Sequence, residues 1–267
     1  VSCLAEQAKI LLAEAEENNL DWKVKQARWE RWRTCSLCEQ DYHGVVRCAL
    51  GWGCWKTYVG RPETDPPRRK AMNVLGSGLF IAGHREDALS VHEAELATMR
   101  RFGASERNIL AVQGSLAITY GSLGRKEEAL QMRRNVYSER LKLDGEENRD
   151  TLTEANNYGV SLLDLGRYEE AKPLFRKAIP IALRVLGEGD ELGLGMRLNY
   201  GQVLCHDGAT LDDLREAVTT LEETERTARR VFGGAHPLTT GIEGDLRNSR
   251  AALRAREAGH RVLFTHA

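Results

Sequence analysis

Cysteine is the residue type with the clearest chemical potential in this sequence. The chain has six cysteines, and five of them lie before residue 56. Cys35 and Cys38 form a C-x-x-C pair, which can hold one Zn²⁺ from a tight turn, although a structural zinc site needs four ligands. His43 follows and is either a recruited ligand or an ordinary residue at the start of a helix. No strand pattern surrounds the pair, so a thioredoxin-like redox role is not indicated, and reduced or metal-bound thiols favour a cytoplasmic location.

The rest of the chain offers no catalytic set. It contains no Ser-His-Asp arrangement, no paired buried carboxylates and no glycine-rich phosphate loop. Four histidines have no metal-ligand spacing among themselves: His84, His92, His206 and His236. Four acidic residues stand where helices are expected to begin, and there they favour the helix dipole: Glu127, Glu128, Glu169 and Glu170. The sequence therefore predicts that this part of the chain is not an enzyme.

An internal repeat organises the sequence after residue 70. One series of glycines recurs at intervals of 41, 42 and 42 residues: Gly83, Gly124, Gly166 and Gly208. A second series recurs at intervals of 42, 42 and 46 residues: Gly103, Gly145, Gly187 and Gly233. The longer last interval contains four extra residues, at 211–214. Four residues make about one helical turn, so we expect the helix face to be nearly preserved.

Residue size also repeats at fixed distances from the first glycine series. Seven residues before the glycine the residue is small: Gly76, Ala117, Gly159 and Gly201. Five residues after it stands alanine, once the insertion is counted: Ala88, Ala129, Ala171 and Ala217. Small residues let two helices approach closely, and a glycine between them ends the first helix in a left-handed conformation. Each unit is therefore predicted to be a helix–turn–helix that buries its core by stacking.

This pattern resembles the tetratricopeptide repeat over about residues 69–257. The period exceeds the usual ~34 residues, and in this longer form the repeats look like those of kinesin light chains. The resemblance implies an all-α fold, a right-handed superhelical solenoid of about four repeats. It also implies a concave groove, lined by the first helix of each repeat, that binds a peptide or protein partner.

In that family an asparagine nine residues before the turn glycine contacts the peptide backbone. Asn157 and Asn199 occupy that position here, whereas Val74 and Ser115 stand there in the other two units. Around them we expect a mixed apolar and amide groove surface, which suits a peptide with few charges. Its further members are Phe80, Ile118, Asn156, Val160, Leu163 and Gln202. The alternative is that these asparagines are merely solvated. The basic clamp of chaperone-binding tetratricopeptide domains is not indicated, because Lys70 and Asn73 alone do not make it.

Residues 4–33 read as helix, with a break at Asn18-Asn19. Trp22, Trp29 and Trp32 share one helical face, which we expect to pack inward. The alternative is contact with RNA or an anionic surface, because residues 21–33 carry five basic and two acidic side chains.

Residues 1–42 also resemble the end of a RING-CH zinc finger. The match consists of Cys3 before Leu4, a long helical spacer, and Trp32-x-x-Cys35-x-x-Cys38 followed by Tyr42. That finger holds two zinc ions with seven cysteines and one histidine. The resemblance implies that Cys35 and Cys38 belong to one zinc and Cys3 to the other, with the remaining ligands upstream of Val1. Neither site is then complete in this chain, so no bound cofactor is expected here. The implied alternative function is a fragment of a zinc-dependent ubiquitin ligase whose repeats read the substrate.

Residues 43–59 are predicted to form a buried helix. Together with the turn that follows it, this helix makes up the segment 43–68, which we expect to cap the first repeat. Its face contains Cys48, Trp52 and Trp55, and both Cys48 and Cys54 are predicted to be small core residues. A proline-rich turn follows at 61–67, and we expect the tail at 258–267 to fray.

Composition narrows the classes of protein further. The formal net charge is −1, with 42% hydrophobic and 29% charged residues. This balance argues against a dedicated nucleic-acid binder and against a disordered chain. No apolar run approaches the ~18 residues that span a bilayer, so no membrane partner is expected. The sequence thus predicts a cytoplasmic protein-interaction scaffold, and it indicates no oligomeric state.

Overall fold

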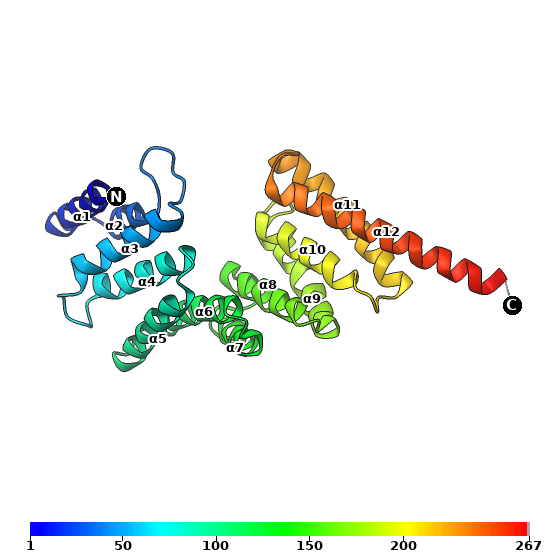
Figure 1. The fold of residues 1–267 in the computed structure, drawn as a ribbon, viewed down its shortest axis with the longest axis horizontal. Coiled ribbons are helices and arrows are strands. Elements are labelled where there is room, and N and C mark those ends of the chain that lie inside the picture. Colours follow the sequence, from blue (N-terminus) through cyan, green and yellow to red (C-terminus); the bar gives the residue numbers. More distant parts are fainter. Residues whose placement is uncertain (266–267) are drawn as a thin grey trace. The chain divides into compact units, whose positions relative to one another are not determined.

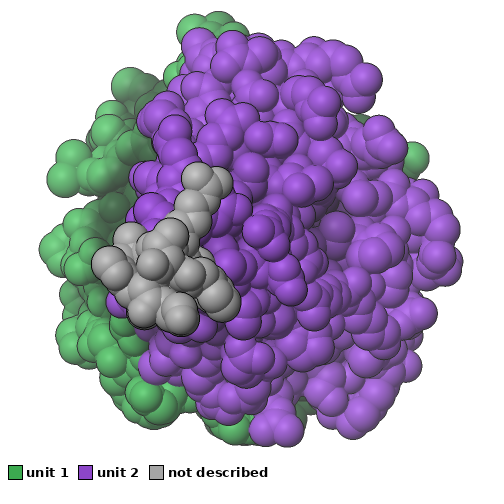
Figure 2. All heavy atoms as spheres, turned by 90° about the vertical axis from the view of Figure 1, so that its right-hand side faces the viewer, with its two compact units in different colours: residues 1–132 green, residues 133–267 purple. Residues whose placement is uncertain are grey.

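All regular elements in the described part of the chain are helices, as the computed structural model shows (Figure 1). The backbone is described for residues 1–265 and the side chains for residues 1–258. The chain divides into two compact units, Val1–Met132 and Arg133–Ala267, which Figure 2 colours separately. No helix within the described residues is both long enough and apolar enough to cross a membrane.

Unit 1 contains six helices, a 3₁₀ turn and the beginning of a further helix. In chain order these are α1 (Ser2–Glu17), α2 (Trp22–Trp29), η1 (Glu30–Trp32), α3 (Gly44–Tyr58), α4 (Pro66–Ile81), α5 (Arg85–Arg101), α6 (Glu106–Ser122) and the start of α7 (Lys126–Asp144). Within this unit, α3 packs against α1, η1 and α4, and α4 packs against α5, which packs against α6.

Unit 2 contains the rest of α7 and five more helices. These are α8 (Arg149–Asp164), α9 (Tyr168–Leu186), α10 (Glu191–Leu204), α11 (Leu211–Phe232) and α12 (Pro237–Thr265). Each helix from α8 onward packs against the next. The predicted helix–turn–helix alternation is confirmed: α4, α6, α8, α10 and α12 are the first helices, and α5, α7, α9 and α11 are the second helices.

The small residues of the repeat stand where two helices meet. A Cβ atom added at Gly159 of α8 would lie 2.4 Å from Cζ of Phe175 on α9. At Gly201 of α10, an added Cβ atom would lie 2.8 Å from Cγ of Leu221 on α11. Both large side chains are completely buried, so each second helix inserts a side chain over the glycine of its first helix. The predicted close approach is therefore confirmed.

The turn glycines follow the prediction in three units out of four. Gly83, Gly124 and Gly166 have φ angles of 88°, 79° and 68°, in the left-handed region that glycine favours. For Gly208 the prediction is wrong, because this glycine does not have a positive φ. The turn after α10 is held instead by a side chain, since Nδ1 of His206 accepts a hydrogen bond from the Gly208 N–H at 3.1 Å.

The four extra residues of the last repeat form the first turn of α11. Thr210 and Asp213 make a capping box there, in which each side chain bonds the backbone N–H of the other residue. Ala217 is completely buried, as are Ala88 and Ala171 at the equivalent positions of their units. The inserted turn therefore keeps the helix face in register, as predicted.

The N-terminal helices carry a core of their own. Trp29 and Trp32 are buried, and the predicted break lies at Asn19, which has a φ angle of 45°. The prediction for Trp22 is wrong, because 72% of its side chain is exposed. Trp22 is the first residue of α2, directly after the N-cap residue Asp21, so its side chain lies at the exposed end of that helix.

Helix α3 packs with its small residues toward α4. An added Cβ atom at Gly51 would lie 3.1 Å from Cα of Leu75. Cys54 is fully buried, as predicted, whereas Cys48 is half-buried. Trp52 is 45% exposed, so the predicted inward face is wrong at that residue; the buried face of α3 passes instead through Leu50 and Cys54.

At the other end of the chain, α12 continues as helix to Thr265. The fraying expected for residues 258–267 stays a prediction. Residues 266–267, and all side chains from residue 259 onward, lie outside the described residues.

Candidate functional site

In unit 2, amide side chains link the first helices of successive repeats. Nδ2 of Asn199 on α10 donates a hydrogen bond to Oδ1 of Asn156 on α8 at 2.9 Å. Nε2 of Gln202 on α10 donates to Oδ2 of Asp245 on α12 at 2.6 Å. Each pair is separated by 43 residues, about one repeat. We call these four residues the amide row; three of its members were predicted to line a groove.

Asn157 lies beside the amide row but makes a different contact. Its Nδ2 donates to Oε2 of Glu154 at 3.4 Å, and the same carboxylate pairs with the buried guanidinium of Arg133 at 3.1 Å. Asn157 and Asn199 are therefore fixed in position without using all the donors and acceptors of their amide groups. Val160 and Leu163, also on α8, are half-buried. The arrangement in unit 2 is compatible with the predicted peptide-binding surface.

In unit 1 the corresponding positions have a different character. Val74 of α4 is buried, and Ser115 of α6 bonds the backbone oxygen of Ala111. Phe80 is half-buried against the core residues of α4 and α5, and Ile118 is 50% exposed on α6. Neither the sequence nor the described contacts give unit 1 a row of amides like that of unit 2.

Unit 1 contains instead a cavity of about 320 Å³ that sequence reasoning missed. We call it the Glu95 cavity. It lies between α2, η1, α4, α5 and α6. Its lining residues are Gln26, Trp29, Glu30, Arg33, Pro66, Arg69, Lys70, Asn73, Val74, Glu95, Met99, Asn108, Ala111 and Val112.

The most unusual member of this lining is Glu95, a carboxyl group with 1% of its surface exposed. Its Oε2 lies 3.4 Å from Nδ1 of His92, which is also buried, and Asn73 donates a further hydrogen bond to it. Burial raises the pKa of Glu95, and the contacts with His92 and Asn73 only partly offset this. Because the folded-state pKa is raised, stability from this group is present at low pH and lost as the pH rises through that pKa.

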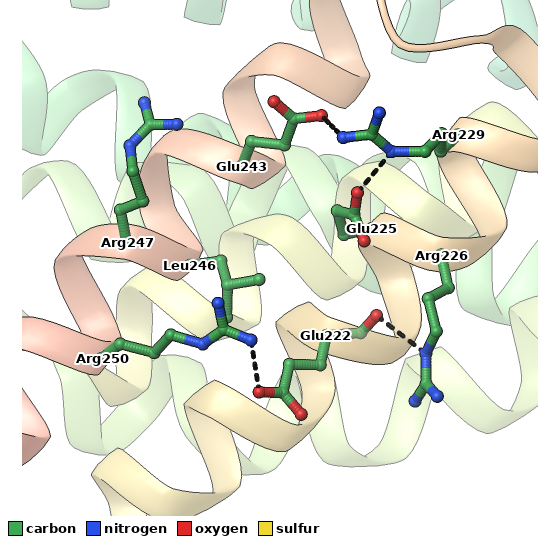
Figure 3. Close-up of a pocket in the computed structure, with 8 residues that line it drawn as sticks. All are labelled: Glu222, Glu225, Arg226, Arg229, Glu243, Leu246, Arg247 and Arg250. Atoms are coloured by element: carbon green, nitrogen blue, oxygen red, sulfur yellow. Dashed lines mark hydrogen bonds and ion pairs between the residues drawn. The ribbon is translucent and has the colours of Figure 1, made fainter.

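A larger cavity of about 470 Å³ lies between α11 and α12 in unit 2 (Figure 3). Its lining is almost entirely charged: Glu222, Glu225, Arg226, Arg229, Glu243, Leu246, Arg247 and Arg250. Arg229 bridges Glu225 and Glu243 across the two helices, and Arg250 pairs with Glu222 at 2.7 Å. We call this surface the charged edge. Its exposed charges largely pair with one another, and exposed ion pairs of this kind contribute little to the stability of the fold.

The Cys35–Cys38 pair lies in the loop between η1 and α3. The backbone N–H groups of Leu37 and Cys38 both point at Sγ of Cys35, the first at 3.5 Å. These bonds, with that of Cys38 the stronger, lower the pKa of the Cys35 thiol. An isolated bridge between Thr34 and Asp41 closes the loop. A lowered pKa eases the loss of the proton from Cys35, and the thiolate is the form of cysteine that binds metals.

Neither Cys3, which the RING-CH resemblance assigns to a second zinc, nor His43 forms a metal-binding group with this pair. Within the described residues, no group of three or more His, Cys, Asp or Glu side chains is arranged to hold a metal ion. Cys3 is exposed on α1, and His43 is the residue before α3. Cys35 and Cys38 alone could offer only two ligands, whereas a closed structural zinc site needs four.

One of the repeats matches a known family model. The tetratricopeptide repeat model matches residues 151–191, which cover most of α8 and all of α9. No curated protein matches the sequence.

Several solved structures are similar in fold. BtubC (BKLC) from P. vanneervenii superposes with a TM-score of 0.63 at 16% identity, over 82% of this chain and 91% of that one. A putative kinesin light chain from P. anserina with tetratricopeptide-like repeats gives 0.57 at 18% identity, over 84% and 94%. The apo form of RapI gives 0.53 at 15% identity, over 83% and 78%. At these identities the likeness concerns the fold, which is that of an all-helical tetratricopeptide-repeat solenoid.

Proposed function

We propose that this chain is a protein-interaction scaffold that binds a peptide segment of its partner along the first helices of its repeats. The amide row is the observation that carries the proposal. Asn156, Asn199 and Gln202 are held by side chains one repeat away, so their remaining donors and acceptors are presented in a fixed arrangement. An extended peptide offers one N–H and one C=O per residue, and fixed amides pair with such groups at low entropic cost.

The test is a selection of binding peptides from a displayed random library, followed by affinity measurements. We expect the double variant Asn157→Ala/Asn199→Ala to bind a selected peptide about tenfold more weakly, the loss of one or two net hydrogen bonds. Asn248→Ala, an exposed amide on α12, is the matched control and should leave the affinity unchanged. The melting temperature of the double variant should fall by only a few degrees, since each lost bond contributes about 1 kcal/mol. Equal losses of binding and stability would show that the two asparagines are structural.

A second proposal concerns the N-terminal loop. We infer that Cys35 and Cys38 form half of a zinc site that is completed by ligands from outside residues 1–258. Support comes from the amide hydrogen bonds to Sγ of Cys35, which stabilise a thiolate before any metal binds. A completed zinc site at this pair is what the alternative function would require, namely a part of a zinc-dependent RING-CH-type ubiquitin ligase whose repeats read the substrate.

The half-site makes a measurable prediction for the isolated chain. We expect its zinc dissociation constant to be weaker than about 1 µM, whereas closed structural sites have binding free energies of about 10–16 kcal/mol. Competition against a chromophoric chelator measures this affinity, with Cys35→Ser/Cys38→Ser as the control that should lose the weak binding. Tight, stoichiometric zinc in the isolated chain would instead mean that a residue such as His43 or Cys48 completes a local site.

A further inference from the structure

The Glu95 cavity combines an apolar wall with a buried hydrogen-bond acceptor. Val74, Met99 and Val112 are 7%, 8% and 2% exposed and supply the apolar part. Glu95 supplies the acceptor and lies on α5, a second helix of the repeats. The first helices α4 and α6 also line the cavity. A volume of about 320 Å³ is at the lower end of the range for ligand pockets, ~300–1,000 Å³.

The carboxyl group of Glu95 is only partly satisfied by its neighbours. A carboxylate has about four acceptor sites. The structure gives it one long contact with His92, at 3.4 Å, and one hydrogen bond from Asn73. A buried acceptor that lacks donors costs free energy, and a ligand that brings donors recovers that cost.

The three cations that line the cavity bond to other groups. Nζ of Lys70 donates to Oε1 of Gln26 at 3.0 Å and lies 5.5 Å from the ring centre of Trp29. Arg33 pairs with Glu30 at 3.4 Å, and Arg69 donates to a backbone oxygen. None of these three contacts involves Glu95, so a cationic ligand would meet a carboxyl group whose contacts are His92 and Asn73.

We propose that the Glu95 cavity takes a basic side chain, Lys or Arg, of the peptide that the scaffold binds. The methylene stem packs on Val74, Met99 and Val112, and the charged head donates its hydrogen bonds to Glu95. This inference rests on the proposed function for its biological context, but the cavity can be tested without any peptide.

The experiment uses n-butylguanidinium chloride as a mimic of an arginine side chain. The chain has four methionines, so labelling their methyl groups with ¹³C gives a simple NMR spectrum. Met99 lines the cavity and is the reporter, and Met196 is fully buried in unit 2 and is the internal control. We expect n-butylguanidinium to shift the Met99 signal saturably and to leave Met196 unchanged. Sodium butyrate, which carries the opposite charge, should produce no saturable shift.

Two variants locate the binding. Glu95→Gln keeps the shape of the side chain and should weaken n-butylguanidinium binding at least tenfold. Because burial raises the pKa of Glu95, the neutral Gln should keep the melting temperature at pH 7 no lower than that of the original chain. Ala111→Leu narrows the cavity from an exposed lining position and should also abolish the shift.

The inference is overturned if no probe shifts Met99, if butyrate binds as well as n-butylguanidinium, or if Glu95→Gln binds the cation unchanged. The selected peptides separate this result from the proposed function. Peptides that bind without any dependence on Lys or Arg would overturn the cavity inference alone. Cation binding in the cavity together with a failed peptide selection would overturn the scaffold proposal alone.

Discussion

Replacing Phe175 with alanine is expected to lower the free energy of unfolding by about 3–5 kcal/mol. The ring is completely buried on α9 and lies directly over Gly159 of α8, where there is no side chain to fill the space left behind. The loss therefore combines the transfer free energy of the ring with the cost of a cavity. Urea denaturation followed by circular dichroism at 222 nm measures the change.

Phe102→Ala is the matched control for this substitution. Phe102 is 39% exposed at the C-terminal end of α5, so its loss should change stability by less than about 1 kcal/mol. Comparable losses for Phe102 and Phe175 would contradict the view that second helices are anchored by large side chains over the repeat glycines.

Gly78→Val is expected to destabilise the chain by about 2–3 kcal/mol. An added Cβ atom on Gly78 of α4 would lie 2.9 Å from the backbone oxygen of Arg47 and 3.3 Å from Cα of Cys48, both on α3. Backbone atoms cannot rotate away as a side chain can, so the two helices must separate. This cost exceeds the gain in helix propensity from replacing glycine inside a helix, which is at most about 1 kcal/mol. Thermal and urea unfolding measure it.

Gly121→Ala tests the same change where space is available. At this position of α6 the nearest atom to an added Cβ is the Cβ of Ala129, at an ordinary 3.8 Å. Alanine should therefore raise stability by about 0.5–1 kcal/mol, because it loses less entropy in a helix than glycine does. A stable Gly78→Val variant would contradict the close packing of α3 on α4.

The repeat architecture could be predicted because it is encoded by residue size at fixed intervals. Close contact of two helices needs a small residue in each repeat, so Gly76, Gly159 and Gly201 recur where the packing demands it. The inserted turn of α11 could be predicted for the same reason, because only an insertion of about one whole helical turn keeps Ala217 in the core.

Predictions that depended on local detail were less successful. Trp22 is in helical phase with Trp29, but it is the first residue of α2 and its side chain is exposed. Gly208 stands at the expected turn position, but the ring of His206 holds that turn, and no left-handed glycine is needed. In both cases a local feature at the end of a helix decides the outcome, and the periodic pattern does not reveal it.

For the candidate site as well, the positions given by the repeat pattern could be predicted, whereas the local contacts could not. Asn157 and Asn199 were found from a resemblance, whereas the hydrogen bond from Asn199 to Asn156 depends on how neighbouring repeats pack. The Glu95 cavity was missed because α2 and η1, which lie before the repeats, form part of its wall. A signal was present in the sequence: His92 and Glu95 interrupt the otherwise apolar buried face of α5.

The charged edge between α11 and α12 has a consequence for polymerisation. At the equivalent positions of the preceding repeat, 46 residues earlier, α9 carries Ile179, Pro180 and Leu183, whereas α11 carries Glu225, Arg226 and Arg229. A stack of identical units can in principle grow without limit, because each new unit offers the next one the same apolar seat. Here a further helix would have to desolvate several ion pairs to dock, which costs more than their attraction returns. Stacking of another copy of the chain through this face is therefore disfavoured relative to stacking through an apolar face.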